Sequence, residues 1–332
     1  MEKELKKFTK KYFSKLGLIY FIGSILIFAV QILVPQLISL IAPNLIIGYD
    51  AYFLSSMLPM YFIAVPILIL LIKRIPVATV PEKKKMSVGQ WLIAFTISCA
   101  CLYLSNFVGL ILTNIIGIIK NGSVQNTIGT ITSLISPATT FFLMVICAPI
   151  VEEIIFRKLL IDRASKYGEK VAILLSGFMF GLFHGNLNQF VYAFTLGCLF
   201  AFIYTKTRNV IHVILLHMGI NFMGSLLGQF ILEKSGYMEL ASAMQNSSSE
   251  EVAQLMSTNA TGLIIYYIYV ILIFALIIAG VILTIVNRKK FVCLKGEIEI
   301  PKGHRFTTIL LNVGMILYCI LWIAMIVLQL FQ

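Results

Sequence analysis

The stretch "ATTFFLMVICAPIVEEIIFRK", residues 138–158, places two adjacent carboxylates and an arginine inside a long apolar run. Residues 138–147 carry no charge, and Glu152, Glu153 and Arg157 then follow within two helical turns. An ionisable group at the centre of a bilayer costs ~2.5–3.5 kcal/mol on insertion scales, so such groups persist where they are paired or line a wet cavity. The stretch therefore predicts a membrane-spanning helix that carries functional groups.

The composition of the whole chain agrees with this reading. Of its 332 residues, 59% are hydrophobic and 12% are charged, whereas soluble domains carry about 25% charged residues. We expect an all-α fold, a polytopic integral membrane helix bundle that forms a single domain over 1–332. A span needs ~20 mostly apolar residues. Nine segments are expected to cross the membrane: 17–42, 51–72, 91–118, 138–160, 171–187, 189–204, 210–231, 262–286 and 307–330.

The basic residues indicate how this bundle is oriented. With the N-terminus inside and the C-terminus outside, all of the 26 Lys and Arg residues except Lys120 and Lys234 fall in inner segments. Cytoplasmic loops are enriched in these residues, so topology accounts for the net charge of +12. We expect a multi-pass protein of a cell membrane, bacterial by its Lys- and Ile-rich composition, with the lipid bilayer and no nucleic acid as partners.

Three other features carry no specific function. The basic start runs into an apolar stretch that is too long for a signal-peptide core, so we expect a retained first span. The six Cys residues show no metal-ligand or disulfide spacing. The long outer loop 233–261 is expected to be a solvated connector with a short helix at 248–256, where "SSSEE" is a capping signal.

Polar groups inside the predicted spans gather in the central third of the chain. Span 171–187 contributes His184, and span 210–231 contributes His217 and Asn221. With a rise of ~1.5 Å per residue, these side chains can meet Glu152 in one layer, whereas His212 falls close to the interface.

Helical spacing divides these groups further. His217 and Asn221 are four residues apart and share a face, and Glu153 and Arg157 have the spacing of an ion pair. Glu152 points about 100° away from Glu153. The pattern predicts that Arg157 neutralises Glu153 and leaves Glu152 for chemistry.

Such a set supports hydrolysis. A carboxylate and a His that face one water can deprotonate it for attack on a carbonyl, and a second His with an Asn amide can stabilise the oxyanion. Two His and one Glu are also the ligands of several zinc hydrolases, so Glu152, His184 and His217 are candidate Zn²⁺ ligands. Each piece alone has a plainer interpretation, such as a solvated carboxylate pair or a hydrogen bond between helices. Their order and common depth favour function.

These residues resemble the three motifs of the CPBP intramembrane proteases, which include CAAX-processing endopeptidases and bacteriocin-processing or self-immunity proteins. The motifs read here as "EEIIFR" at 152–157, "FGLFH" at 180–184 and "HMGIN" at 217–221. The resemblance covers about 138–230, which we take as the catalytic core. One departure is visible, because many relatives follow the motif arginine with Gly and this chain has Lys158.

The resemblance also implies roles. Glu152 would activate water together with His184, and His217 and Asn221 would stabilise the oxyanion. The supporting residues would be Glu153, Arg157 and Phe180. The family is usually described as metalloproteases, although a metal-free glutamate mechanism has also been argued for it.

Three functions are compatible with the sequence. The first is an intramembrane endopeptidase acting on a membrane-associated peptide or protein, with a peptide precursor or membrane-protein segment favoured over a prenylated CAAX substrate. The second is a catalytically idle scaffold or bacteriocin self-immunity protein. The third is a transporter, for which the sequence shows no convincing internal repeat.

Overall fold

The computed structural model describes residues 2–77 and 81–331, and this part of the chain is helical with no strands. Eight of its helices are long and apolar enough to cross a membrane, which makes the chain a multi-pass membrane protein. Their bounds are Lys3–Ile41, Gly48–Lys73, Val88–Ile119, Pro137–Tyr167, Leu187–Thr207, Val210–Lys234, Ala260–Lys290 and Val313–Leu330. The all-α prediction is therefore confirmed.

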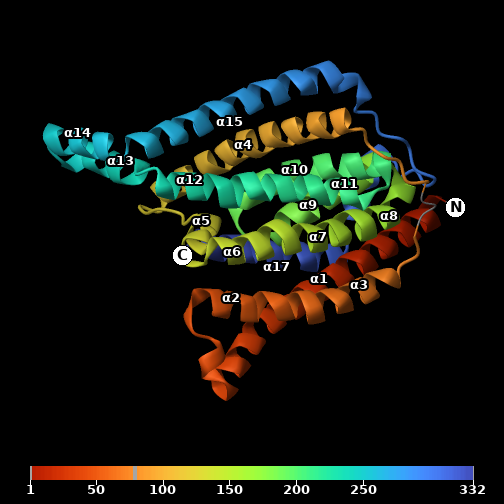
Figure 1. The fold of residues 1–332 in the computed structure, drawn as a ribbon. Coiled ribbons are helices and arrows are strands. Elements are labelled where there is room, and N and C mark those ends of the chain that lie inside the picture. Colours follow the sequence, from red (N-terminus) through yellow and green to blue (C-terminus); the bar gives the residue numbers. More distant parts are fainter. Residues whose placement is uncertain (1, 78–80, 332) are drawn as a thin grey trace.

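The fifth expected span, 171–187, differs from a full membrane helix. It forms α9, Glu169–Phe183, which has 15 residues and is roughly 22 Å long, shorter than the ~30 Å hydrocarbon core. The chain then turns, since Gly185 has φ +65°, and α10 begins at Leu187. The start of α1, Glu2–Ile41, and the end of α17, Val313–Leu330, lie at opposite ends of the bundle (Figure 1). Because this requires an odd number of passes, α9 acts as a short pass in addition to the eight long helices.

The helices stand in layers along one bundle (Figure 1). One edge is α15, Ala260–Asn287, which packs on α4, Val88–Ile119. The other edge holds α2, Gly48–Pro59, and α3, Val65–Lys73, beside α1, Glu2–Ile41. Only 6% of the apolar window of the α15 span is buried, so its outer face is left to lipid.

The helix α9 packs along α10, Leu187–Thr207. Glycines allow the two backbones to approach closely, as small residues do between membrane helices. A Cβ at Gly177 would lie 2.4 Å from Cys198 Sγ, and one at Gly197 would lie 3.0 Å from Gly177 Cα. A Cβ at Gly181 would lie 3.1 Å from Phe190 O. The packing of α9 on α10 therefore depends on these three positions.

Three π-helical segments interrupt the spans that carry the predicted site. Phe141–Cys147 and Ile154–Leu159 flank α7, Ala148–Glu153, and Phe222–Leu227 follows α11, Val210–Asn221. Wide turns of this kind re-aim side chains and are frequent at functional sites. The spans expected over 138–160 and 210–231 are present as Pro137–Tyr167 and Val210–Lys234, with these wide turns inside them.

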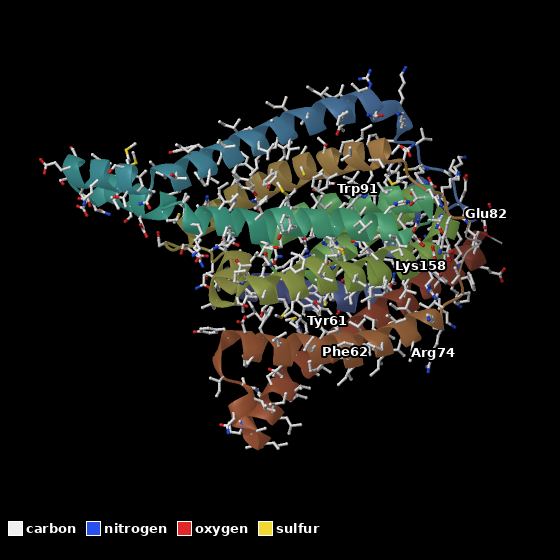
Figure 2. All side chains as sticks on the ribbon, in the orientation of Figure 1. Tyr61, Phe62, Arg74, Glu82, Trp91 and Lys158 are labelled. Carbon is white, nitrogen blue, oxygen red and sulfur yellow. The ribbon has the colours of Figure 1, made fainter. Side chains whose placement is uncertain are left out.

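Basic loops mark one end of the bundle, which we call the basic end: residues 73–77 and 81–87, 163–168, 208–209 and 288–304. Arg74, Glu82 and Lys158 lie toward this end (Figure 2). The opposite end carries α5, Thr127–Leu134, and the hairpin of α13, Tyr237–Asn246, with α14, Ser249–Thr258. The expected short helix is confirmed as α14, and the Ser248 side chain accepts from Glu251 N at its start.

The remaining elements are short or continue the spans. They are Pro43–Leu45, Met60–Ala64, α6 (Pro137–Thr140), α8 (Leu160–Ala164), Ser165–Tyr167, α12 (Gly228–Lys234), Arg288–Lys290, Lys302–His304, α16 (Arg305–Ile309) and α17 (Val313–Leu330).

Candidate active site

The four residues predicted to meet, Glu152, His184, His217 and Asn221, all line one cavity of about 430 Å³. Glu152 lies fifteen residues from either end of the span Pro137–Tyr167, so this carboxylate sits near the middle of that span. Further lining residues come from the half of the bundle away from the basic end: Gln31, Phe53, Met57, Asn106, Asn126 and Ile128. His212 is not among the lining residues and accepts a hydrogen bond from Met86 N at 3.1 Å.

Beside the cavity, Glu153 connects a cation and an imidazole. Its Oε2 lies 2.9 Å from Arg157 Nε, and both side chains are 0% exposed. Its Oε1 lies 2.8 Å from His217 Nδ1. The predicted ion pair is therefore present, and the sequence did not indicate the second contact. Glu153 fixes the orientation of the His217 ring, as carboxylates do for functional histidines.

Phe180 covers the arginine. The Arg157 guanidinium carbon lies 4.2 Å from the centre of the Phe180 ring and 5.8 Å from that of Phe200. Within the described residues, Arg157 Nη1 and Nη2 have no hydrogen-bond acceptor, so these aromatic faces are a main part of their environment. A cation over an aromatic face is worth ~2 kcal/mol or more when desolvated. The Phe180 ring also meets His184 edge-on, with ring centres 4.7 Å apart.

The hydrogen bonds of the two histidines determine their tautomers. His217 Nδ1 faces a carboxylate oxygen, and His184 Nδ1 lies 2.9 Å from Phe180 O. Because these oxygens only accept, each Nδ1 carries the hydrogen. In the neutral ring, each Nε2 then presents a lone pair, and His217 Nε2 is 3.7 Å from Glu152 Oε2. Neutral His184 and His217 are thus acceptors at Nε2 and cannot donate from it.

Asn221 has one amide hydrogen committed. Its Nδ2 donates to Met144 O at 2.8 Å, within the π-helical segment Phe141–Cys147. An amide nitrogen carries two hydrogens, so one remains for a ligand in the cavity. This bond also joins the span that carries Glu152 to the span that carries His217.

Two further residues at the start of α10, Asn186 and Gln189, were not identified from the sequence. Asn186 Oδ1 accepts from Gln189 N at 2.8 Å, and Asn186 Nδ2 donates to His184 O at 3.2 Å. These backbone contacts fix which end of the Asn186 amide is oxygen. Asn186 Nδ2 also donates to Gln189 Oε1, so the Gln189 amide nitrogen is the end left for the cavity, which Gln189 lines. The helix-start pattern Asn-x-x-Gln was the available signal.

The donor types suit zinc, but their positions do not form a zinc site. Glu152 and two histidines are ligands that zinc accepts, and an acceptor on Nδ1 is usual for a metal-bound histidine. Within residues 2–77 and 81–331, however, there is no group of three or more His, Cys, Asp or Glu side chains that could hold a metal ion.

Comparison with known proteins agrees with this geometry. Residues 134–223, which contain all three motifs, match the family described as "Type II CAAX prenyl endopeptidase Rce1-like". By this match the chain is similar to the CPBP family. It is 31% identical over 166 residues to the protein named "Putative membrane peptidase YdiL" of Bacillus subtilis (strain 168). That match covers 48% of this chain and 66% of the relative, just under two thirds of its length. No solved structure matches the chain.

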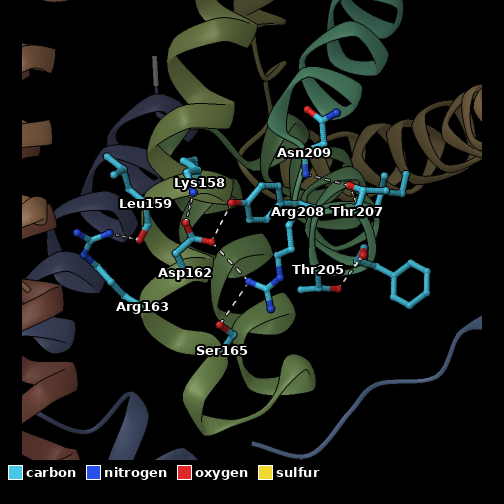
Figure 3. A network of polar contacts seen from close by, with 12 residues as sticks. Lys158, Leu159, Asp162, Arg163, Ser165, Thr205, Thr207, Arg208 and Asn209 are labelled. Atoms are coloured by element: carbon cyan, nitrogen blue, oxygen red, sulfur yellow. Dashed lines mark hydrogen bonds and ion pairs between the residues drawn. The ribbon is translucent and has the colours of Figure 1, made fainter. Parts of the chain in front are cut away.

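Lys158, the departure from the common CPBP pattern, belongs to a polar network at the basic end (Figure 3). Its Nζ lies 2.5 Å from Asp162 Oδ2. Asp162 Oδ1 accepts from Tyr204 Oη at 2.8 Å and lies 3.5 Å from Arg208 Nη1. Arg208 ends α10 with φ +50°, an uncommon conformation for a residue other than glycine. The network ties the helix after the Glu-Glu-x-x-x-Arg motif to the end of α10.

We expect Tyr204→Phe to lower the free energy of unfolding by about 1.5–3 kcal/mol, the value of a hydrogen bond to a charged group. Asp162 keeps Lys158 and Arg208, so the variant should still fold. Thermal and denaturant unfolding of the purified protein measure the change. The exposed Tyr52→Phe is the control and should unfold as the wild type does; an equal loss of stability in both variants would contradict the account.

Proposed function

We propose that this protein is an intramembrane endopeptidase that hydrolyses a peptide bond of a membrane-associated peptide or protein. The observation that supports this most strongly is the convergence of Glu152 and the two histidines on one cavity inside the membrane-spanning bundle. A carboxylate and an imidazole nitrogen with a free lone pair can both accept a proton from water. The family match and the relative's name agree with a peptidase.

In the proposed reaction, the oxygen of a water molecule attacks the peptide carbonyl carbon. Glu152, assisted by His184, takes a proton from that water at the same time. The carbonyl π electrons move to oxygen and give a tetrahedral oxyanion. Its collapse breaks the C–N bond, and the proton held by Glu152 passes to the leaving nitrogen. Collapse thus gives a carboxylic acid and an amine, and transfer of the acid proton to the amine leaves a carboxylate and an ammonium group. Glu153 and Arg157 take no part in proton transfer and hold His217 in place.

The oxyanion needs hydrogen-bond donors. His217, proposed for this role by family resemblance, donates from Nε2 only when its ring carries both protons, because Nδ1–H is directed at Glu153. The remaining amide hydrogen of Asn221 requires no such change, and neither does the Gln189 amide nitrogen. We propose Asn221 and Gln189 as donors, with His217 contributing in its imidazolium form.

Replacing a donor should reduce the rate without abolishing the reaction. We expect Asn221→Ala to lower kcat by roughly 10²–10³-fold, the usual effect of losing one oxyanion donor. Gln189→Leu should lower kcat in the same direction, whereas the exposed α14 variant Gln254→Leu should leave it unchanged. Single-turnover cleavage in proteoliposomes measures these rates. Wild-type rates for both Asn221→Ala and Gln189→Leu would show that the two amides take no part in the mechanism.

Zinc remains a proposal that metal analysis can test. A metal mechanism requires near-stoichiometric Zn²⁺ in the purified wild type and a reversible loss of activity on chelation. Cleavage by protein that carries no metal would instead favour direct activation of water by Glu152 and His184. The idle scaffold is the second candidate, and it predicts no cleavage by the wild type under any of these conditions.

A further inference from the structure

An apolar groove lies on the outside of the bundle, away from the candidate active site. Its volume is about 380 Å³, and its walls come from α9, α10 and α16. Two of its residues are basic, Lys170 and Arg305, and the others are apolar, among them Leu174, Phe178 and Phe306. Leu174 is 47% exposed and Phe306 is 63% exposed, so the groove opens toward the lipid.

The two cations stand at the basic end. Lys170 is the second residue of α9, and Arg305 is the first residue of α16. Arg305 Nε donates to Ile300 O at 3.1 Å, which fixes the stem of the guanidinium. Phe178 lies eight residues beyond Lys170, roughly 12 Å further into the hydrocarbon at ~1.5 Å per residue. The groove thus begins with positive charge at the headgroup level and continues as apolar surface.

Acidic side chains nearby have partners of their own. Glu169 contacts Lys206 and accepts from Leu294 N at 2.8 Å. Glu299 lies 2.9 Å from Lys295 Nζ. Lys170 and Arg305 therefore keep positive charge available to an anion at the mouth of the groove.

We propose that this groove binds one anionic phospholipid, with its phosphate between Lys170 and Arg305 and an acyl chain along Leu174, Phe178 and Phe306. Basic pockets between membrane helices at the cytoplasmic side are suited to anionic headgroups. A zwitterionic lipid fits the apolar part equally well but gains less from the two cations. The proposal does not depend on the proposed peptidase activity.

The test is native mass spectrometry of the full chain released from vesicles with equal amounts of phosphatidylglycerol and phosphatidylcholine that have identical acyl chains. The wild type should retain one phosphatidylglycerol in preference to phosphatidylcholine. Each basic residue near an anionic lipid contributes about fivefold in affinity, so Lys170→Gln with Arg305→Gln should weaken retention by roughly 20- to 30-fold. The single variant Lys170→Gln changes an exposed residue, keeps the fold and should show about a fivefold loss.

Two further variants separate site binding from general charge. Lys289→Gln with Lys290→Gln removes the same charge from exposed residues outside the groove and should leave retention unchanged. Leu174→Trp fills the groove without a change of charge and should weaken retention. Equal retention of the two lipids by the wild type would overturn the proposal, as would an equal loss in the Lys289/Lys290 control or wild-type retention by Leu174→Trp.

Discussion

Peptide cleavage by a Glu152→Gln variant is expected to be slower than wild type by about 10²–10⁴-fold, the usual contribution of a general base. The amide has nearly the same shape as the carboxylate but cannot take a proton from water. Glu152 has no ion-pair partner closer than the 3.7 Å contact with His217 Nε2 among the described residues, so the variant should fold and insert normally. Single-turnover cleavage in proteoliposomes gives the rate, and thermal unfolding gives the stability.

Glu82→Gln is the matched control for this variant. Glu82 is exposed in the loop before α4 and lies near the basic end (Figure 2), so the same chemical change there should leave both rate and stability unaltered. Cleavage at the wild-type rate by Glu152→Gln would contradict both the direct and the metal version of the mechanism.

The second large effect is expected on stability, from Arg157→Met. The substitution leaves the fully buried Glu153 carboxylate with His217 as its remaining partner, and breaking a buried ion pair in this way costs ~3–5 kcal/mol. It also removes the guanidinium that packs on the Phe180 ring. Equilibrium unfolding in a mixed-micelle denaturant series measures the loss, and activity should fall with it because Glu153 orients His217.

Removing both charges provides an independent check. Glu153→Gln together with Arg157→Met leaves no unpaired charge, so the double variant should be more stable than the sum of the two single losses implies. Lys158→Met alters the adjacent, 41% exposed side chain, and its partner Asp162 keeps Tyr204 and Arg208, so this change should cost less stability than Arg157→Met. Strict additivity of Glu153→Gln and Arg157→Met, or wild-type stability of Arg157→Met, would contradict the role of the pair.

Much of the architecture follows from the sequence because the bilayer imposes strong rules. Long apolar segments must be helical, since helices satisfy their own backbone hydrogen bonds in lipid, and this makes most spans readable. The fifth expected span is the exception. Its apolar run ends at Phe183, and the polar turn His184–Asn186 lies inside the expected bounds 171–187. The expected span therefore extended four residues past the end of α9.

The composition of the site was also predictable, but its connections were not. Spacing of four residues indicated the Glu153–Arg157 pair, because both residues lie on one helix. The contacts of Glu153 with His217, of Asn221 with Met144 and of Arg157 with Phe180 join different helices. Such contacts depend on helix rotation and on the π-helical segments, which carry no clear sequence signal. The link from Asn186 to Gln189 was visible only as a helix-start pattern.

The central claim is that Glu152 and its neighbours hydrolyse a peptide bond with water activated inside the cavity. The most direct test incubates the purified wild type in ¹⁸O-labelled water with membranes from cells that lack this chain, followed by mass spectrometry of the new peptide ends. The account predicts new C-terminal carboxylates that carry the label with the wild type and none with Glu152→Gln. Absence of labelled ends with the wild type, or equal labelling with both proteins, would contradict it.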